Sequence, residues 1–166
     1  MPAFAPAFAD RPLAIRGGFE AHLTVDTDRR ADFEALHARI VAAGFSIVRT
    51  KLEAFASNEG VPPLDDGGYF EFHVKVRVDP TRLEALARIA QSCGGRLSRN
   101  DRQHLPTQRF VTMRVYRATR AAAEAQLEAL LAALDAAGFD RASIAREYTL
   151  YDSRIELDAG WLEPPL

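Results

Sequence analysis

Hydrophobic and polar residues alternate in several short stretches of this chain, and each stretch is followed by residues with helical spacing. Residues 19–25, 69–78 and 109–116 alternate in the manner of half-buried strands, whose successive side chains point to opposite faces. Behind them, apolar residues recur every three to four positions, as on one face of a helix: Phe33, Leu36, Ile40 and Val41; Leu83, Leu86, Ile89 and Ala90; Leu127, Leu130, Leu131 and Leu134. The pattern predicts strands that alternate with amphipathic helices.

Turn and capping residues set the expected limits of these elements. Asp79-Pro80 is expected to begin the second helix, because it supplies a cap followed by proline at the first helical position. Glycine commonly ends helices, and it stands at the expected ends of all three: Gly44, Gly94-Gly95 and Gly138. A second strand is expected after each helix, over residues 46–55, 96–99 and 144–151.

The elements group into three β-α-β units, over about residues 19–55, 69–100 and 109–152. Units of this kind resemble the split βαβ arrangement of ferredoxin-like folds. We therefore expect an α+β fold with an antiparallel sheet and helices on one face, in which the first two units form the module and the third extends it. The first and third strands, residues 19–25 and 69–78, would then lie side by side in the middle of the sheet.

The ends of the chain and its composition add expectations about organisation. Residues 1–16 are expected to be an N-terminal arm, residues 17–166 a single domain, and residues 153–166 its C-terminal tail. The net charge of −2 predicts neither a nucleic-acid nor a membrane partner. A single cysteine, Cys93, excludes an internal disulfide, which together with the lack of a long apolar run favours a cytoplasmic location.

A Glu-x-His phrase occurs twice in the predicted strands, as Glu20-Ala21-His22 and Glu71-Phe72-His73. Residues i and i+2 of a strand share a face, and side chains on neighbouring strands lie about 5 Å apart at Cβ. The four groups could bind Zn, Mn or Fe, or an imidazole beside a carboxylate could act as a general base. The candidate catalytic and metal-ligating residues are Glu20, His22, Glu71 and His73.

Arginine is concentrated between residues 96 and 120, where seven arginines face one acidic residue. Because arginine binds carboxylates and phosphates, the segment predicts a small anionic ligand. The candidate ligand-binding residues are Lys75, Arg77, Arg99, Arg102, Arg114 and Tyr151, and the phase of the last strand leaves open whether Arg146 or Glu147 joins them. The alternative is a solvated surface whose charge is balanced by Asp152, Glu156 and Asp158.

Two classes of function follow from these residues. In the first, the chain binds a small anionic molecule on the polar face of the sheet, and in its sharper form it is a metal-assisted hydrolase or a proton-transfer enzyme. In the second, the same face is a non-catalytic surface for dimerisation or for another protein. We expect a homo-oligomer, and the sequence leaves open whether the chain is an enzyme.

Overall fold

A computed structural model describes residues 29–62, 67–98 and 107–158, which fall in two compact units, residues 1–46 and residues 47–166. Helix α1 (Arg30–Ala42) belongs to the first unit. It ends as predicted at Gly44, whose φ of +81° is left-handed and whose N–H donates to the carbonyl of Val41. Throughout the described ranges, no helix combines the length and apolar character that crossing a bilayer requires.

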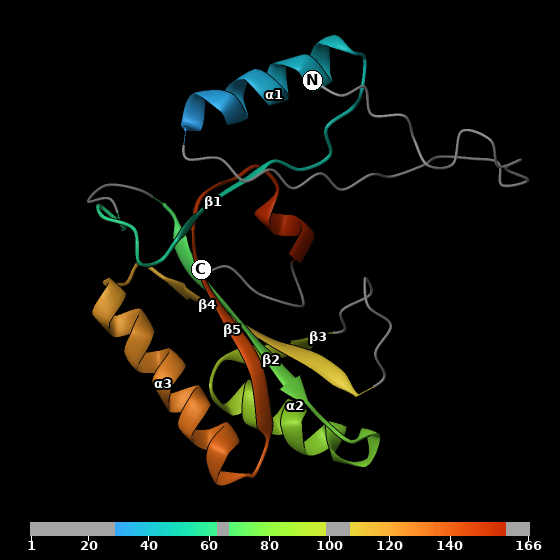
Figure 1. The fold of residues 1–166 in the computed structure, drawn as a ribbon, viewed down its shortest axis with the longest axis vertical. Helices are drawn as coiled ribbons and strands as arrows, with labels where there is room; N and C mark the ends of the chain where they lie inside the picture. The colour runs from blue at the N-terminus through green and yellow to red at the C-terminus, as the bar shows by residue number, and fades with distance from the viewer. Residues whose placement is uncertain (1–28, 63–66, 99–106, 159–166) are drawn as a thin grey trace, which may run out of the picture. The chain divides into compact units, whose positions relative to one another are not determined.

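The second unit is an α+β structure built on one antiparallel sheet (Figure 1). In the described residues the sheet has five strands in the order β1-β5-β2-β4-β3: β1 (Lys51–Phe55), β2 (Tyr69–Arg77), β3 (Gly95–Ser98), β4 (Gln108–Tyr116) and β5 (Asp140–Asp152). Helix α2 (Leu83–Ser92) joins β2 to β3, and α3 (Arg120–Ala136) joins β4 to β5. Two short 3₁₀ turns, η1 (Pro80–Arg82) and η2 (Ile155–Asp158), precede α2 and follow β5.

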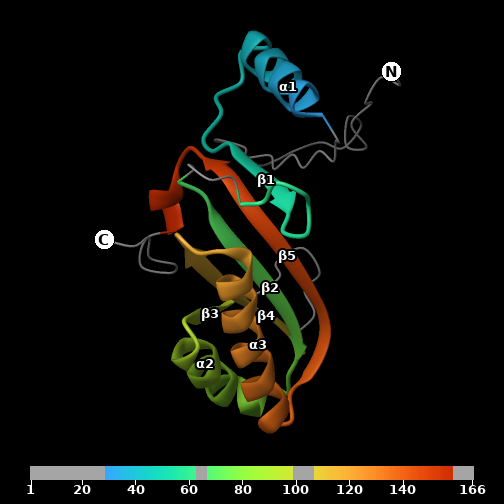
Figure 2. The same cartoon turned by 90° about the vertical axis from the view of Figure 1, so that its left-hand side faces the viewer.

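The hydrophobic core lies between one face of this sheet and helices α2 and α3 (Figure 2). The predicted inward side chains of β2 are at most 1% exposed: Phe70, Phe72, Val74 and Val76. Leu86 of α2 and Leu127, Leu130 and Leu134 of α3 are completely buried against them. The predicted apolar faces of β2, α2 and α3 are therefore confirmed.

The predicted limits of the two core helices also hold. Asp79 accepts a hydrogen bond from the backbone N–H of Thr81 at 2.8 Å and so begins the segment that leads into α2. Gly94 and Gly138 follow the two helices with left-handed φ values of +78° and +68°. Helix start and stop signals act locally, which explains why the sequence alone located them.

The strand predicted over residues 46–55 is shorter than expected and begins only at Lys51. Its first residue is paired with Asp152, where β5 ends, so no partner strand continues beside residues 46–50. Val48, expected in the middle of the strand, is 57% exposed. The length of β1 is thus set by its partner and not by its own apolar residues.

The predicted order of the units is wrong, because β2 is paired along both of its edges with strands of the third unit. Phe70 lies opposite Val115 of β4 on one side and opposite Tyr148 of β5 on the other. A strand has only two edges, and in the described residues β4 and β5 occupy both edges of β2. Residues 19–25 lie outside the described part of the chain, and the domain limits at residues 16 and 17 stay a prediction.

Candidate functional site

The candidate site lies on the open face of the sheet, the face opposite α2 and α3. Glu71, His73, Lys75 and Arg77 of β2 alternate with the core residues and so belong to this face, as predicted. The register places Arg114 of β4 and Glu147 of β5 opposite Glu71. Arg146 instead bonds to Glu124 of α3 at 3.2 Å, which settles the phase of the last strand.

Glu71 is the centre of an ion cluster on this face. Its Oε2 atom accepts hydrogen bonds from Lys51 Nζ at 2.8 Å and from Arg114 Nε at 2.9 Å, and its side chain is 4% exposed. Its Oε1 atom lies 3.3 Å from His73 Nε2. Burial would raise the pKa of Glu71, but the His73 hydrogen bond and the charges of Lys51 and Arg114 hold it well below its usual range. Glu71 is therefore ionised, and its negative charge is balanced by Lys51, Arg114 and His73.

His73 lies between two carboxylates and a hydroxyl. Its Nε2 atom is 3.3 Å from Glu71 and 3.4 Å from Glu147, and its Nδ1 atom is 3.0 Å from Thr112 Oγ1. Burial would lower the pKa of His73, but hydrogen bonds to Glu147 and Glu71 raise it to about 9. At neutral pH the ring is an imidazolium, so both ring N–H groups donate and neither nitrogen is free to accept a proton.

A second group of ion pairs extends the cluster toward the end of β5. Arg114 Nη2 lies 2.6 Å from Asp158, and Arg49 Nη2 lies 2.7 Å from Asp158 and 2.6 Å from Asp152. The hydroxyl of Tyr69 donates to Asp152 at 2.8 Å. These contacts fasten η2 and the segment before β1 to the open face. Of the acids named in the alternative, Asp158 pairs with Arg114, but the Arg114 side chain is 4% exposed and so is not part of a solvated surface.

The remaining predicted ligand residues are scattered. Arg77 is exposed at the end of β2 and is paired with Asp140 at 2.7 Å. Tyr151 is 54% exposed and lies opposite Leu52 in the β1–β5 pair. Lys75 stays on the open face, with its Nζ 5.3 Å from the centre of the Phe110 ring. Outside the described residues lie Glu20, His22, Arg99 and Arg102.

Sequence reasoning did not select three cations that the structure places on or beside this face, Arg49, Lys51 and Arg96. Arg49, Lys51 and Glu53 stand at alternate positions, which is the spacing of one face of an extended segment, and this signal could have found the first two. Arg96 is located only by register, because it pairs with Thr112. No local pattern could have supplied that pairing.

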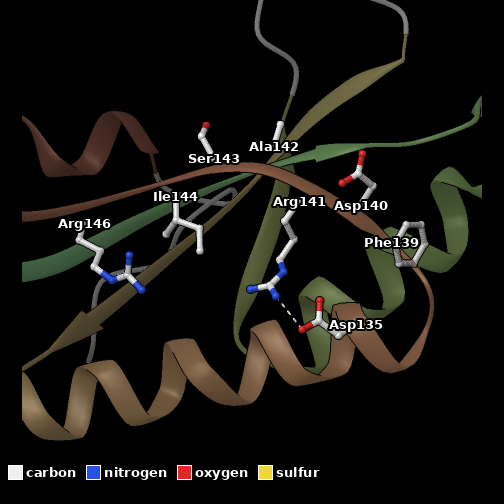
Figure 3. A pocket seen from close by; sticks show the side chains of 8 residues that line it. All are labelled: Asp135, Phe139, Asp140, Arg141, Ala142, Ser143, Ile144 and Arg146. Atoms are coloured by element: carbon white, nitrogen blue, oxygen red, sulfur yellow. Dashed lines mark hydrogen bonds and ion pairs between the residues drawn. The ribbon is translucent and has the colours of Figure 1, made fainter.

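Two hollows in the described residues lie beside β5, and neither is lined by Lys75 or Phe110. The first, of about 530 Å³, lies between β5 and the end of α3, where Arg141 reaches Asp135 at 2.7 Å (Figure 3). The second, of about 490 Å³, is lined by residues that include Phe55 and Arg120. In residues 29–62, 67–98 and 107–158, no three His, Cys, Asp or Glu side chains are placed to hold a metal ion.

Neither a protein-family model, nor a curated protein, nor a solved structure was found to match this chain. Its function is therefore inferred from the residues of the open face.

Proposed function

We propose that the protein binds a small anionic molecule on the open face, at a cationic patch next to the ion cluster. The patch consists of two rows of side chains that cross strands β2, β4 and β3. One row is Lys75, Phe110 and Ser98, and the other is His73, Thr112 and Arg96. On β5 the rows continue into the small side chains Ser143 and Ala145, which leave space above the sheet.

The observation that carries the proposal is the charge of these two rows. Lys75 and Arg96 have no carboxylate partner among the described residues, whereas Lys51 and Arg114 each bind carboxylates in the ion cluster. Within residues 29–62, 67–98 and 107–158, Arg96 donates to the backbone carbonyl of Gly95 alone, at 3.2 Å. The rows hold Lys75 and Arg96 and no acidic residue, and the charge of the His73 imidazolium is already balanced by Glu71 and Glu147. An anion would complete the pairing that the fold itself leaves open.

The enzymatic form of the proposal gives His73 the role of a proton donor. An imidazolium that is held between two carboxylates cannot act as a general base at neutral pH, but it can donate a proton to an anionic substrate that takes the place of Thr112 at its Nδ1 atom. A Zn, Mn or Fe ion at Glu71 and His73 would have to displace that proton first. Elemental analysis of the purified protein tests the metal-assisted form, which predicts a stoichiometric metal.

We also infer a finer description of the fold. Strands β2 to β5 lie in the order β5-β2-β4-β3 and are joined by two helices that share one core. This is the connectivity of a ferredoxin-like split βαβ module, with β1 added at its edge. In such a module the open face is available to ligands, which is consistent with the proposed site.

The competing function is a non-catalytic module that associates with itself or with another protein. It is favoured by Phe55 and Tyr151, two large apolar side chains near the β1 edge that are 71% and 54% exposed. Sedimentation equilibrium distinguishes the two functions, because association through this edge gives a concentration-dependent mass that the substitution Phe55→Ser abolishes.

The anion site is tested by calorimetric titration of the full chain with inorganic phosphate and with acetate at low ionic strength. We expect Lys75→Ala and Arg96→Ala each to weaken binding by about tenfold or more, because each removes one charge-assisted contact. Arg77→Ala is the matched control, since Arg77 lies on the same strand but is already paired with Asp140. Equal losses in all three variants, or no binding by the native chain, would contradict the proposal.

A further inference from the structure

We propose that the ligand of the cationic patch carries a phosphate monoester, and that Lys75 and Arg96 together hold its doubly charged head. This inference rests on the proposed function and goes beyond it by naming the ligand class. It follows from two features of the patch: the direction in which Lys75 lies across the sheet, and the number of positive charges that no acidic residue balances.

The ammonium group of Lys75 lies over the ring of Phe110, on the strand between the two cations. Lys75 is on β2, and its partner across the sheet is Phe110 of β4. The Nζ atom of Lys75 is 5.3 Å from the centre of the Phe110 ring, in a cation–π contact. Beyond β4 lies β3, the strand that carries Arg96. The charge of Lys75 is therefore turned toward the side of the sheet on which Arg96 lies.

Arg96 is near enough to the same ring to share a ligand with Lys75. Its partner on β4 is Thr112, two residues from Phe110, so Arg96 and Phe110 are diagonal neighbours on the open face. Diagonal neighbours are about 7 to 8 Å apart, a distance that long side chains can span. The guanidinium donates to the carbonyl of Gly95 through Nη1, which leaves the rest of its donor fork for a ligand. One anionic group between the two side chains can thus contact both cations.

The two cations together require a group with two negative charges. Neither has a carboxylate partner among the described residues, and the charge of His73 is balanced by Glu71 and Glu147. A carboxylate, a sulfate ester or a phosphate diester carries a single negative charge and leaves one cation unbalanced. A phosphate monoester carries about −1.5 to −2 at neutral pH and offers three acceptor oxygens. Its charge and its acceptors match a lysine and an arginine that share one group.

The test compares doubly and singly charged heads by calorimetric titration of the full chain at low ionic strength. Methyl phosphate is a dianion at pH 8, because its second pKa is about 6, whereas dimethyl phosphate and acetate are monoanions. We expect one methyl phosphate to bind per chain, about tenfold tighter than either monoanion, because the second charge strengthens the contacts with both cations.

Substitutions test whether the two cations act on one group. In Lys75→Ala or Arg96→Ala, the advantage of methyl phosphate over dimethyl phosphate should fall to about twofold, because a single charge then balances the cation that remains. Arg77→Ala is the matched control and should keep the full advantage, since Arg77 is already paired with Asp140. An advantage that stays complete in both the Lys75 and the Arg96 variant would overturn the inference.

The failure of this inference can be told apart from the failure of the proposed site. Equal affinity for methyl phosphate and dimethyl phosphate, with losses still confined to the Lys75 and Arg96 variants, overturns the phosphate monoester and leaves the anion site standing. Two methyl phosphates per chain, one of them lost in each variant, also overturn it, because the cations then act separately. If none of these anions binds, the anion site itself is refuted.

Discussion

At the scale of single residues, the chemistry of the open face depends on how His73 is held. The sequence showed a histidine two residues from a glutamate, which is compatible with a general base. The structure adds a second carboxylate, Glu147, from a strand more than seventy residues later in the chain. Together the two carboxylates raise the pKa of His73 to about 9, so that its role changes from proton acceptor to permanent cation at neutral pH.

The raised pKa predicts a pH dependence of stability. A histidine that holds its proton more tightly when folded stabilises the fold fully below its unfolded pKa of about 6.5, and this contribution is lost as pH rises through about 9. Between pH 7 and pH 9 we expect the free energy of unfolding to fall by about 2 kcal/mol because of this group. Urea denaturation across this range measures the effect.

The control for this prediction is His73→Gln, which keeps a hydrogen-bonding side chain without a titrating ring. The variant is expected to be less stable at pH 7 and to show a flatter dependence between pH 7 and pH 9. A native protein whose stability does not change over this range would show that His73 is not held as an imidazolium.

At the scale of elements, the sequence predicted well the features that depend on a few neighbouring residues, such as the ends of helices. The phrase Ala-Ala-Gly-Phe at residues 42–45 and 136–139 ends both α1 and α3 in the same way. In each copy the glycine N–H bonds back three residues and the phenylalanine N–H bonds back five, to Ile40 and to Leu134. The lengths of β1 and β5 were missed, because each depends on a strand distant in the sequence: β1 on β5, and the beginning of β5 on β2.

The shared helix ending predicts the effect of one substitution. Gly138 has φ +68° and open space around the position of a Cβ atom, so Gly138→Ala costs backbone strain alone. We expect a loss of about 1 kcal/mol in the free energy of unfolding, measured by denaturant titration. Gly138→Asn is the matched variant and should lose less, since asparagine tolerates the left-handed conformation. Equal stability of the alanine variant and the native chain would argue against this helix ending.

At the scale of the molecule, the open face is assembled from parts of the chain that are distant in sequence. Arg49 reaches Asp152, and Arg114 joins Glu71 to Asp158, so the ion cluster ties the beginning, middle and end of the second unit together. The polar alternation of β2 predicted that Glu71 and His73 share a face, but not which residues meet them there. The pairing of β2 with β4 and β5 decided that, and the pairing of β3 with β4 located Arg96.

The distribution of charge over this face separates a structural part from a part that is free to bind. The arginine-rich segment as a whole suggested an anion site, yet Arg114 is used within the protein and Arg77 is paired at the strand end. Among the lysines and arginines of this face in the described ranges, Lys75 and Arg96 have no carboxylate partner. The proposed site is therefore displaced by one row from the position that the twin Glu-x-His phrases indicated.

Amide chemical shifts recorded by NMR while inorganic phosphate is titrated into the ¹⁵N-labelled protein test the site most directly. The account predicts saturable shifts that are largest for Lys75, Arg96, Phe110 and Thr112 and small along α3. Shifts concentrated instead at the hollow beside α3, around Asp135 and Arg141, or a spectrum that does not change, would contradict it.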